Sequence, residues 1–341
     1  MKFNARRLVK AMIVSGVILA SVIPVPGRAG QAVYTGQIAV PAYGSSVSAM
    51  PWAVAMQKGF FKQQGLNITG IITSAGGSED VRNLIAGNLI FADSNLVPVL
   101  RAIQGGADLK VISEDGHTTA QFVWIVRRGS PIKTLADLKG KKITFTTPLS
   151  TSQFLDDELV KKAGLAPSDV HLISTGAYGS ALTALENGGV DVALIVEPVY
   201  TLNKGRFQVL FWSRDLFPAI SSTVGVTSAA DAKYHGDVLR RILLAHRQAV
   251  DYIRTNPKDA AAAIAPIYRM NPAVVQSILL ELGAKTSTDG VPFFSQDDID
   301  AAGMDNLVDA AIAAGALQGK PDWRAAVDQE FLPADLKRKL N

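Results

Sequence analysis

Short apolar runs alternate with segments of helical period along most of the chain. A short apolar run is typical of a buried strand, and apolar residues three and four apart are typical of one helix face. Strands are predicted at residues 37–40, 68–73, 89–92, 122–126, 142–146, 170–173 and 190–196. Because helical segments separate these strands, the pattern predicts βαβ units, a mostly parallel sheet and the α/β class.

The order of these elements is repeated in the second half of the chain. Small-residue loops at 74–78 and 174–180 are each followed by a helix and a strand. We therefore expect an α/β protein of two similar α/β lobes, joined by a hinge that the chain crosses twice. The predicted parts are residues 30–127 for the first lobe, 128–222 for the second lobe, and 223–341 for a mostly helical return to the first lobe.

Several helix starts are marked by capping residues. Ser78 precedes two acidic residues and is predicted as an N-cap, and Ser150 with Gln153 predicts a capping box. Pro257 is predicted at the first position of a helix in the return segment.

The first 29 residues have the pattern of a secretory signal peptide. A basic start with Arg6 and Arg7 precedes an apolar run, and Pro24 and Pro26 lead to the small Ala29. A membrane anchor is the alternative, but the run is shorter than the roughly 20 residues that a spanning helix needs. We expect cleavage near Ala29, no membrane anchor, and a periplasmic protein.

Charge and composition exclude several functional classes. Residues 1–29 hold five basic residues and no acidic one, so their removal changes the formal net charge from +4 to −1. No basic surface for nucleic acid is therefore expected. The chain has no cysteine, which excludes thiolate metal sites, a cysteine nucleophile and a lipid-modified cysteine. The four histidines show no metal-ligand spacing, and no metal or other cofactor is expected.

Small and polar residues follow the predicted strands, at the ends where ligands bind in parallel sheets. Several of these residues stand at the starts of helices, and the first turn of a helix can hold an anionic group without arginine. The candidate ligand-binding residues are Tyr43, Ser45, Ser46, Gly76, Gly77, Ser78, Ser94, Asn95, Ser150, Thr151, Tyr178 and Glu197. Each Ser or Asn could instead be only a helix cap, and Glu197 could pair with a ligand cation or cap a neighbouring helix.

Aromatic residues also fall near these loops. Large aromatic side chains belong mostly to the core, and one or two could stack on a ligand. The residues concerned are Tyr43, Trp52, Phe91, Trp124, Tyr200 and Trp212.

Five stretches, spread in order over nearly the whole chain after residue 29, form a recognisable set of motifs. They are PWAVAMQKGFFKQQGLNI at 51–68, SAGGS at 74–78, IKTLADLKGKKI at 132–143, DVALIVEP at 191–198 and NPKDAA at 256–261. Together they resemble nitrate/sulfonate/taurine-type substrate-binding proteins. The resemblance implies a type II periplasmic-binding fold, a small-molecule ligand, and ABC permease and ATPase subunits as partners. The loop TPLSTS at 147–152 departs from the family's Gly-Ser-type turn and leaves Ser150 and Thr151 as the contacts there.

These observations favour a binding protein over an enzyme. The chain lacks the cysteine-rich motif of pyrimidine synthases of this fold, a G-x-S-x-G elbow and a G-x-G-x-x-G fingerprint. The predicted function is the periplasmic solute-binding component of an ABC importer, which captures a small organic anion of the sulfonate or carboxylate type between two lobes and delivers it to a permease. A neutral pyrimidine-type ligand, or a pyrimidine-synthase-like enzyme, is the alternative.

Overall fold

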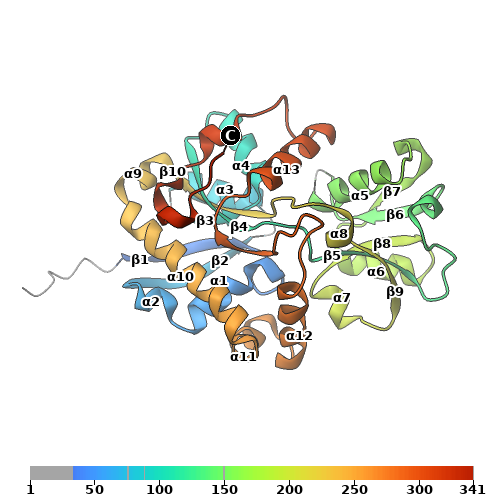
Figure 1. Ribbon diagram of the computed structural model, residues 1–341, viewed down its shortest axis with the longest axis horizontal. Coiled ribbons are helices and arrows are strands. Elements are labelled where there is room, and N and C mark those ends of the chain that lie inside the picture. The colour runs from blue at the N-terminus through green and yellow to red at the C-terminus, as the bar shows by residue number, and fades with distance from the viewer. Residues whose placement is uncertain (1–33, 75–76, 88, 149, 341) are drawn as a thin grey trace, which may run out of the picture. The chain divides into compact units, whose positions relative to one another are not determined.

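The computed structural model describes residues 34–74, 77–87, 89–148 and 150–340. Two β-sheets, each covered by helices, make up these residues (Figure 1). The predicted signal peptide at 1–29 lies outside the described residues.

The first sheet has six strands in the order β11-β4-β10-β3-β1-β2. β1 pairs in parallel with β2 and β3, whereas β10 is antiparallel to β3 and β4, and β11 is antiparallel to β4. The strands are β1 (Tyr34–Pro41), β2 (Leu66–Ser74), β3 (Ala92–Ser94), β4 (Leu109–Gly116), β10 (Thr223–Ser228) and β11 (Phe294–Asp297).

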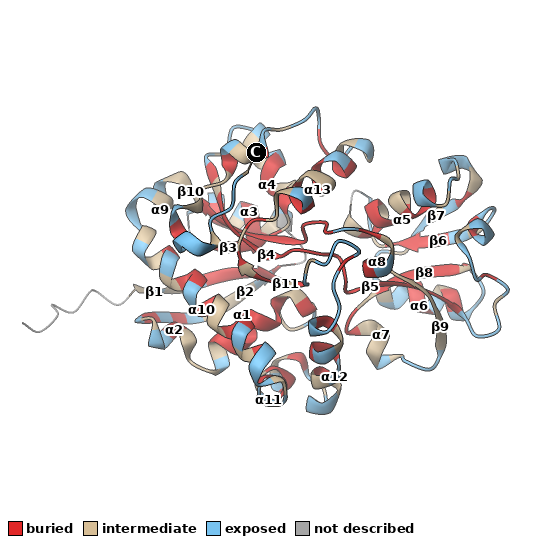
Figure 2. Ribbon diagram, viewed as in Figure 1, coloured by how far each residue is buried: buried red, intermediate tan, exposed pale blue. Residues whose placement is uncertain are grey.

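Both faces of the first sheet are buried, as the alternation along β1 shows. Ile38 and Val40 pack in one apolar cluster with α1 and α10, and Ala39 packs in a second cluster with α3, α4 and α13. Figure 2 shows the buried strands between the helices. On the first face lie η1 (Val47–Ala49), α1 (Met50–Gln57), α2 (Phe60–Gln63), α10 (Gly236–Thr255), α11 (Pro257–Tyr268) and α12 (Pro272–Gly283). On the second face lie α3 (Gly77–Ile85), α4 (Leu96–Gln104) and α13 (Ala301–Ala313).

The return segment after β10 is mostly helical. Its longest helix, α10, buries Leu239, Ile242 and Leu243 at helical spacing, and α11 begins with Pro257 as predicted. The other elements are α9 (Ala229–Tyr234), α14 (Trp323–Ala326), η4 (Gln329–Phe331) and η5 (Ala334–Leu336).

The second sheet has five strands in the order β7-β6-β8-β5-β9. β6 is parallel to β7 and β8, and β5 is antiparallel to β8 and β9. Along β5, Val123 and Ile125 face α6, while Trp124 and Val126 belong to the cluster that contains α5. The strands are β5 (Phe122–Arg127), β6 (Lys142–Phe145), β7 (His171–Ser174), β8 (Val192–Val196) and β9 (Phe207–Trp212). The helices are η2 (Leu135–Leu138), α5 (Thr151–Lys162), η3 (Pro167–Asp169), α6 (Tyr178–Glu186), α7 (Val199–Leu202) and α8 (Ser213–Leu216).

The structure corrects three predictions. The sheets are mixed rather than mostly parallel, because β10 and β11 in the first sheet and β5 in the second run antiparallel to the strands beside them. The strands β4, β9 and β11 were not predicted. The strand expected at 89–92 is β3 at Ala92–Ser94. Residues 122–127, assigned from the sequence to the first lobe, form β5 of the second sheet, so the chain enters that sheet before residue 127.

Candidate functional site

The carboxyl ends of the parallel strands lie along one edge of each sheet. In the first sheet β1, β2, β3 and β4 run in the same direction, because β10 is antiparallel to both β3 and β4. In the second sheet β6, β7 and β8 run in the same direction. Ligands of α/β sheets bind beyond such carboxyl ends, so the loops that follow these strands form the candidate site.

Two connecting segments join these two edges. Residues 117–121 lead from the carboxyl end of β4 into β5, whose first residue is paired with Val196 at the carboxyl end of β8. Residues 213–222 return from β9 to β10, whose first residue, Thr223, is paired with Gly116 at the carboxyl end of β4. The strand-end loops of both sheets therefore flank the same pair of segments.

The loop after β1 brings together three predicted residues. Ser45 is exposed and its hydroxyl donates to the carbonyl oxygen of Ala42 at 3.0 Å. The hydroxyl oxygens of Ser46 and Ser48 are 2.7 Å apart. Burial raises the pKa of Tyr43 to about 12. This turn therefore places several hydroxyl groups at the carboxyl end of β1, where the hydrogen of Ser45 is bonded to Ala42.

The loop after β2 is only partly described. Gly76 lies outside the described residues, and α3 begins at Gly77. Ser78 is therefore an exposed residue of the first helical turn, and its predicted role as N-cap is wrong. Burial raises the pKa of Asp80, two residues further on, to about 7, and a hydrogen bond with Ser74 opposes the shift.

The loop after β3 is tied to the second connecting segment. Asn95 is the N-cap residue of α4, but its amide Nδ2 donates to the carbonyl oxygen of Ser222 at 2.9 Å. Ser94 is fully buried. Asn95 therefore holds the carboxyl end of β3 against the segment that leads into β10.

Hydroxyl groups gather in the second sheet, where β6 ends and α5 begins. The oxygens of Thr146 and Ser152 are 2.8 Å apart, as are those of Ser150 and Ser152. Ser150 caps α5, since its oxygen accepts from the backbone N–H of Gln153 at 3.3 Å. Burial raises the pKa of Tyr178, at the start of α6, and a hydrogen bond with Ser152 opposes that shift. We call Thr146, Ser150, Ser152 and Tyr178 the hydroxyl cluster.

Two members of the hydroxyl cluster were missed by the sequence. Thr146 was read as the last residue of a strand, and Ser152, which is buried, lies inside α5. Ser150 and Tyr178 were predicted, and Thr151 is the first residue of α5, beside them. A strand that ends in threonine, followed by two hydroxyl residues in the first turn of a helix, was the sequence signal that could have predicted these two members.

Glu197 caps a helix in the structure. It is buried, and its carboxylate accepts from the N–H of Thr201 at 3.2 Å and from its hydroxyl at 2.9 Å. Burial raises the pKa of Glu197, while the bonds from Thr201 and the charge of Arg214 oppose the shift. Of the two roles considered from the sequence, the geometry favours capping of α7.

Arg214 is a buried cation between the two sheets that the sequence did not single out. It lies in α8, on the second connecting segment, and its side chain is 3% exposed. It donates to the carbonyl oxygen of Ala120 on the first segment at 3.4 Å and to Glu281 of α12 at 2.5 Å. Its guanidinium stands 4.0 Å from the ring centre of Trp212, which in turn contacts Tyr200 edge-on. Arg214 therefore links both connecting segments to α12.

The remaining aromatic candidates divide as expected from their size. Trp52, Phe91 and Trp124 are fully buried and belong to the apolar clusters. Tyr200 and Trp212 are half-buried.

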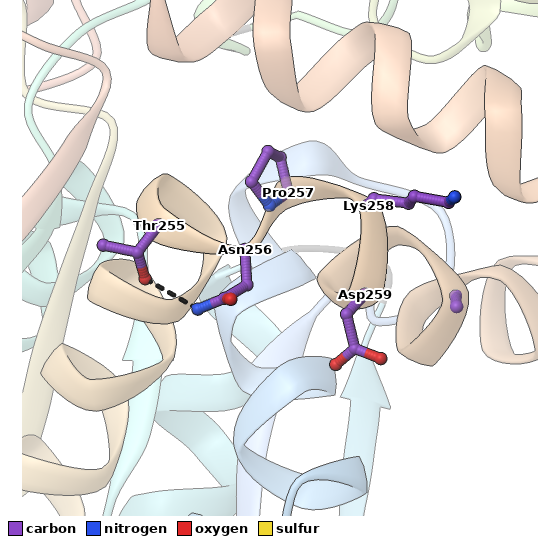
Figure 3. A pocket seen from close by; sticks show the side chains of 6 residues that line it. Thr255, Asn256, Pro257, Lys258 and Asp259 are labelled. Carbon is purple, nitrogen blue, oxygen red and sulfur yellow. Dashed lines mark hydrogen bonds between the residues drawn. The ribbon is translucent and has the colours of Figure 1, made fainter.

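Two surface pockets of the described residues lie elsewhere. One, of about 430 Å³, is lined by residues 255–259 and Ala262 at the junction of α10 and α11 (Figure 3). The other, of about 530 Å³, lies between β11, the start of α13 and Arg338. None of the predicted ligand-binding residues that the structure describes lines either pocket. Within the described ranges, no helix has the length and apolarity needed to cross a membrane.

The fold is similar to those of solved binding proteins. The periplasmic aliphatic sulphonate binding protein SsuA from Escherichia coli superimposes with a TM-score of 0.73 at 22% identity, over 86% of this chain and 92% of that one. The periplasmic nitrate-binding protein NrtA from Synechocystis PCC 6803 gives a TM-score of 0.66 at 14% identity, over 89% and 91% of the two chains. The chain thus has the periplasmic binding protein fold, as expected.

The sequence defines the family. The profile described as NMT1/THI5 like matches residues 47–260, and the chain belongs to this family. A protein from Escherichia coli (strain K12), named as an aliphatic sulfonates-binding protein, is 28% identical over 205 residues. That match spans 60% of this chain and 63% of the relative's length. The resemblance noted in the sequence is thereby confirmed.

Proposed function

We propose that the chain is the periplasmic solute-binding component of an ABC importer and captures a small organic anion of the sulfonate or carboxylate type. The observation that carries the proposal is the meeting of strand-end loops from both sheets at the two connecting segments. The loops after β1 and β6 offer hydroxyl groups there. The names of the two sulfonate-binding proteins point to the same ligand class, and that of the nitrate-binding protein points to a small anion.

Helix starts and hydroxyl groups are sufficient to hold such an anion. A partly buried helix N-terminus stabilises an anion by up to about 2 kcal/mol. A hydrogen bond to a charged group contributes about 1.5–3 kcal/mol. The start of α5 with the hydroxyl cluster, together with the loop after β1, could therefore reach a micromolar Kd, about −8 kcal/mol. Ser45, Ser46, Ser150 and Thr151 are the proposed contacts, with Tyr43 and Tyr178 beside them.

Capture would be followed by delivery to membrane partners. In this proposal residues 1–29 direct export and are removed, and the loaded protein docks on a permease with its ATPase. The two lobes are residues 34–116 with the return from residue 223, and residues 122–212, and they close about the connecting segments. We propose binding rather than catalysis, because the relative's name describes binding.

A thermal-shift panel tests this function. Purified protein would be heated with alkanesulfonates, an aromatic sulfonate, taurine, small carboxylates, nitrate, bicarbonate and a neutral pyrimidine. A ligand at about 100 times its Kd adds about 2.7 kcal/mol, which raises the Tm by several degrees. A shift with a sulfonate or carboxylate, confirmed by calorimetry at one site per chain, supports the proposal. A shift with the pyrimidine alone would favour the alternative ligand class, and no shift with any compound would contradict the function.

A further inference from the structure

Three buried residues from distant parts of the chain meet beneath the first sheet. Asp115 lies on β4, His246 on α10 and Asp297 at the end of β11, and they are 3%, 0% and 0% exposed. One donor atom from each lies within 4.8 Å of the donor atoms of the other two. Buried carboxylates are normally paired or bound to a metal, because an isolated buried charge is costly. We call Asp115, His246 and Asp297 the buried triad.

The triad is held in place by its neighbours. His246 Nδ1 and Asp297 Oδ1 are 2.6 Å apart, and Arg247 donates to the other oxygen of Asp297 at 2.8 Å. The ring of His246 lies 4.4 Å from that of Trp52, and Ser113 donates to Asp115 Oδ1 at 2.8 Å. An ion bound at Nε2 of His246 would leave Asp297 orienting the imidazole through Nδ1, whereas an ion that binds Asp297 Oδ1 directly would replace that hydrogen bond.

Two atoms of the triad have no partner. Among the described residues, neither Nε2 of His246 nor Oδ2 of Asp115 has a hydrogen-bond partner, although both atoms are buried. An unpaired buried nitrogen and an unpaired buried carboxylate oxygen call for a missing partner, and an ion is one of the few that serve both. The backbone of Asp297 is in the left-handed region, with φ of 70°, a conformation that aspartate tolerates.

The local charge also favours a cation. Asp93, whose carboxylate accepts from Trp52 Nε1 at 3.1 Å, adds a further buried acid beside Asp115. Arg247 is bound to Asp297, and the charges of His246 and His117 also act favourably on Asp115. A divalent cation would neutralise the excess acid and supply the missing partner.

We propose that Asp115, His246 and Asp297 form a structural site for one divalent metal cation, with Zn²⁺ as the best-fitting ion. One imidazole and two carboxylates are ligands that Zn²⁺ accepts, at about 2.0–2.2 Å. Two tetrahedral ligand atoms on one Zn²⁺ are about 3.3–3.6 Å apart, so the three donors, which lie within 4.8 Å of one another, would have to shift by about 1 Å to bind the ion. The ion would tie β4 to α10 and β11, two elements of the return segment. The site does not depend on the proposed function.

The test begins with the purified protein refolded in the presence or absence of Zn²⁺, because the donors are buried and the ion must enter during folding or opening. We expect one zinc per chain by elemental analysis after dialysis, and a Tm several degrees above that of the zinc-free protein. Asp115→Asn and His246→Gln should abolish both effects. His235→Gln is the matched control, since His235 faces Asp231 at 3.7 Å on the surface and should leave both unchanged.

Locating the bound zinc by crystallography keeps the proposal testable if the triad variants do not fold. Crystals of the wild-type protein refolded with Zn²⁺ should give an anomalous peak at the zinc edge between the three side chains. The proposal is overturned if refolded wild-type protein holds no stoichiometric zinc, if the triad variants retain it as the wild type does, or if the anomalous peak lies only elsewhere. The triad would then be a histidinium ion pair without a metal.

Discussion

The hydroxyl oxygens of Thr119 and Ser213 lie 2.7 Å apart and join the two segments that connect the sheets. Both residues are buried. Arg214 adds a second link from the same segment to the carbonyl oxygen of Ala120. Because the segments bond to each other, any movement of one sheet relative to the other must carry both segments or break these bonds.

We expect Thr119→Val and Ser213→Ala to destabilise the protein non-additively. Each single change leaves one buried hydroxyl without its partner, at a cost of about 1–3 kcal/mol, whereas the double change removes both groups. The double variant should therefore lose less than the sum of the singles, by about 0.5–1.5 kcal/mol. Urea unfolding of the four proteins measures this coupling. As a control, Thr119→Val is combined with Thr255→Val, at the exposed end of α10, and their effects on the free energy of unfolding should be additive. If the effects of Thr119→Val and Ser213→Ala are additive too, the bond between these hydroxyl groups contributes nothing.

Ligand binding should make the molecule more compact without changing its secondary structure. Hinge closure around a ligand is a known motion of periplasmic binding proteins, and here the hinge is placed at residues 117–121 and 213–222. Small-angle scattering with and without a ligand from the panel should give a smaller radius of gyration, with an unchanged far-ultraviolet circular dichroism spectrum. A radius that stays the same within error would count against closure.

Export should remove the leader. We expect protein recovered from the periplasm of a double-membraned bacterium to begin near Gly30, because the small Ala29 follows a helix-breaking stretch. Intact-mass measurement checks the mature terminus. Full-length protein in the membrane fraction would show that the segment is an anchor instead.

The sequence predicted the elements whose signals are local. The parallel strands, the apolar face of α10 and the start of α11 at Pro257 follow from period and capping within a few residues. β4 was missed because Glu114 and Asp115 interrupt its apolar pattern. These acids are buried only through distant partners, since the N–H of Asp300 donates to Glu114 at 2.7 Å and His246 lies beside Asp115. No local pattern reports such a partner.

The candidate site was predicted in outline and not in its contacts. The rule that ligands lie beyond parallel strand ends identified Ser150 and Tyr178. It could not show that Thr146 and Ser152 would join them, because this depends on how the end of β6 packs on α5. The buried triad could not be predicted from the spacing of residues in the sequence, because its members come from three elements far apart along the chain.

Ser150→Ala should weaken binding of the true ligand about tenfold or more. The change removes one hydroxyl from the hydroxyl cluster and the cap of α5, and a hydrogen bond to a charged group is worth about 1.5–3 kcal/mol. The cap itself contributes only about 0.5–2 kcal/mol to stability, so the fold should persist. Titration calorimetry measures the affinity, with Ser45→Ala as a second test in the first sheet. Ser277→Ala, an exposed serine of α12 whose hydroxyl donates to Val274, is the control that should bind normally. Wild-type affinity in both test variants would place the site elsewhere.

Asp156→Asn should make the protein relatively more stable as pH rises. Asp156 is fully buried in α5, where it accepts from Trp124 Nε1 at 2.7 Å, and burial raises its pKa well above the ordinary 3.8. In the unfolded chain this carboxyl ionises near its ordinary pKa, while the native state keeps it protonated. The wild type therefore loses stability as pH rises above 3.8, until the folded pKa is reached. Asparagine can still accept from Trp124 and has no charge to bury. Urea unfolding at about pH 4.5 and about pH 7.5 should show the variant gaining on the wild type at the higher pH.

Asp137→Asn is the control of opposite sign. Asp137 is exposed and accepts from the N–H groups of Lys133 and Thr134 and from the hydroxyl of Thr134, which lowers its pKa. Its contribution is present above the ordinary carboxyl pKa and is lost as pH falls through the lowered value. The Asp137→Asn variant should therefore trail the wild type at neutral pH and approach it in acid. If the Asp156→Asn and wild-type stabilities differ by the same amount at both pH values, Asp156 does not titrate differently in the folded and unfolded chains, and the inference from its burial is wrong.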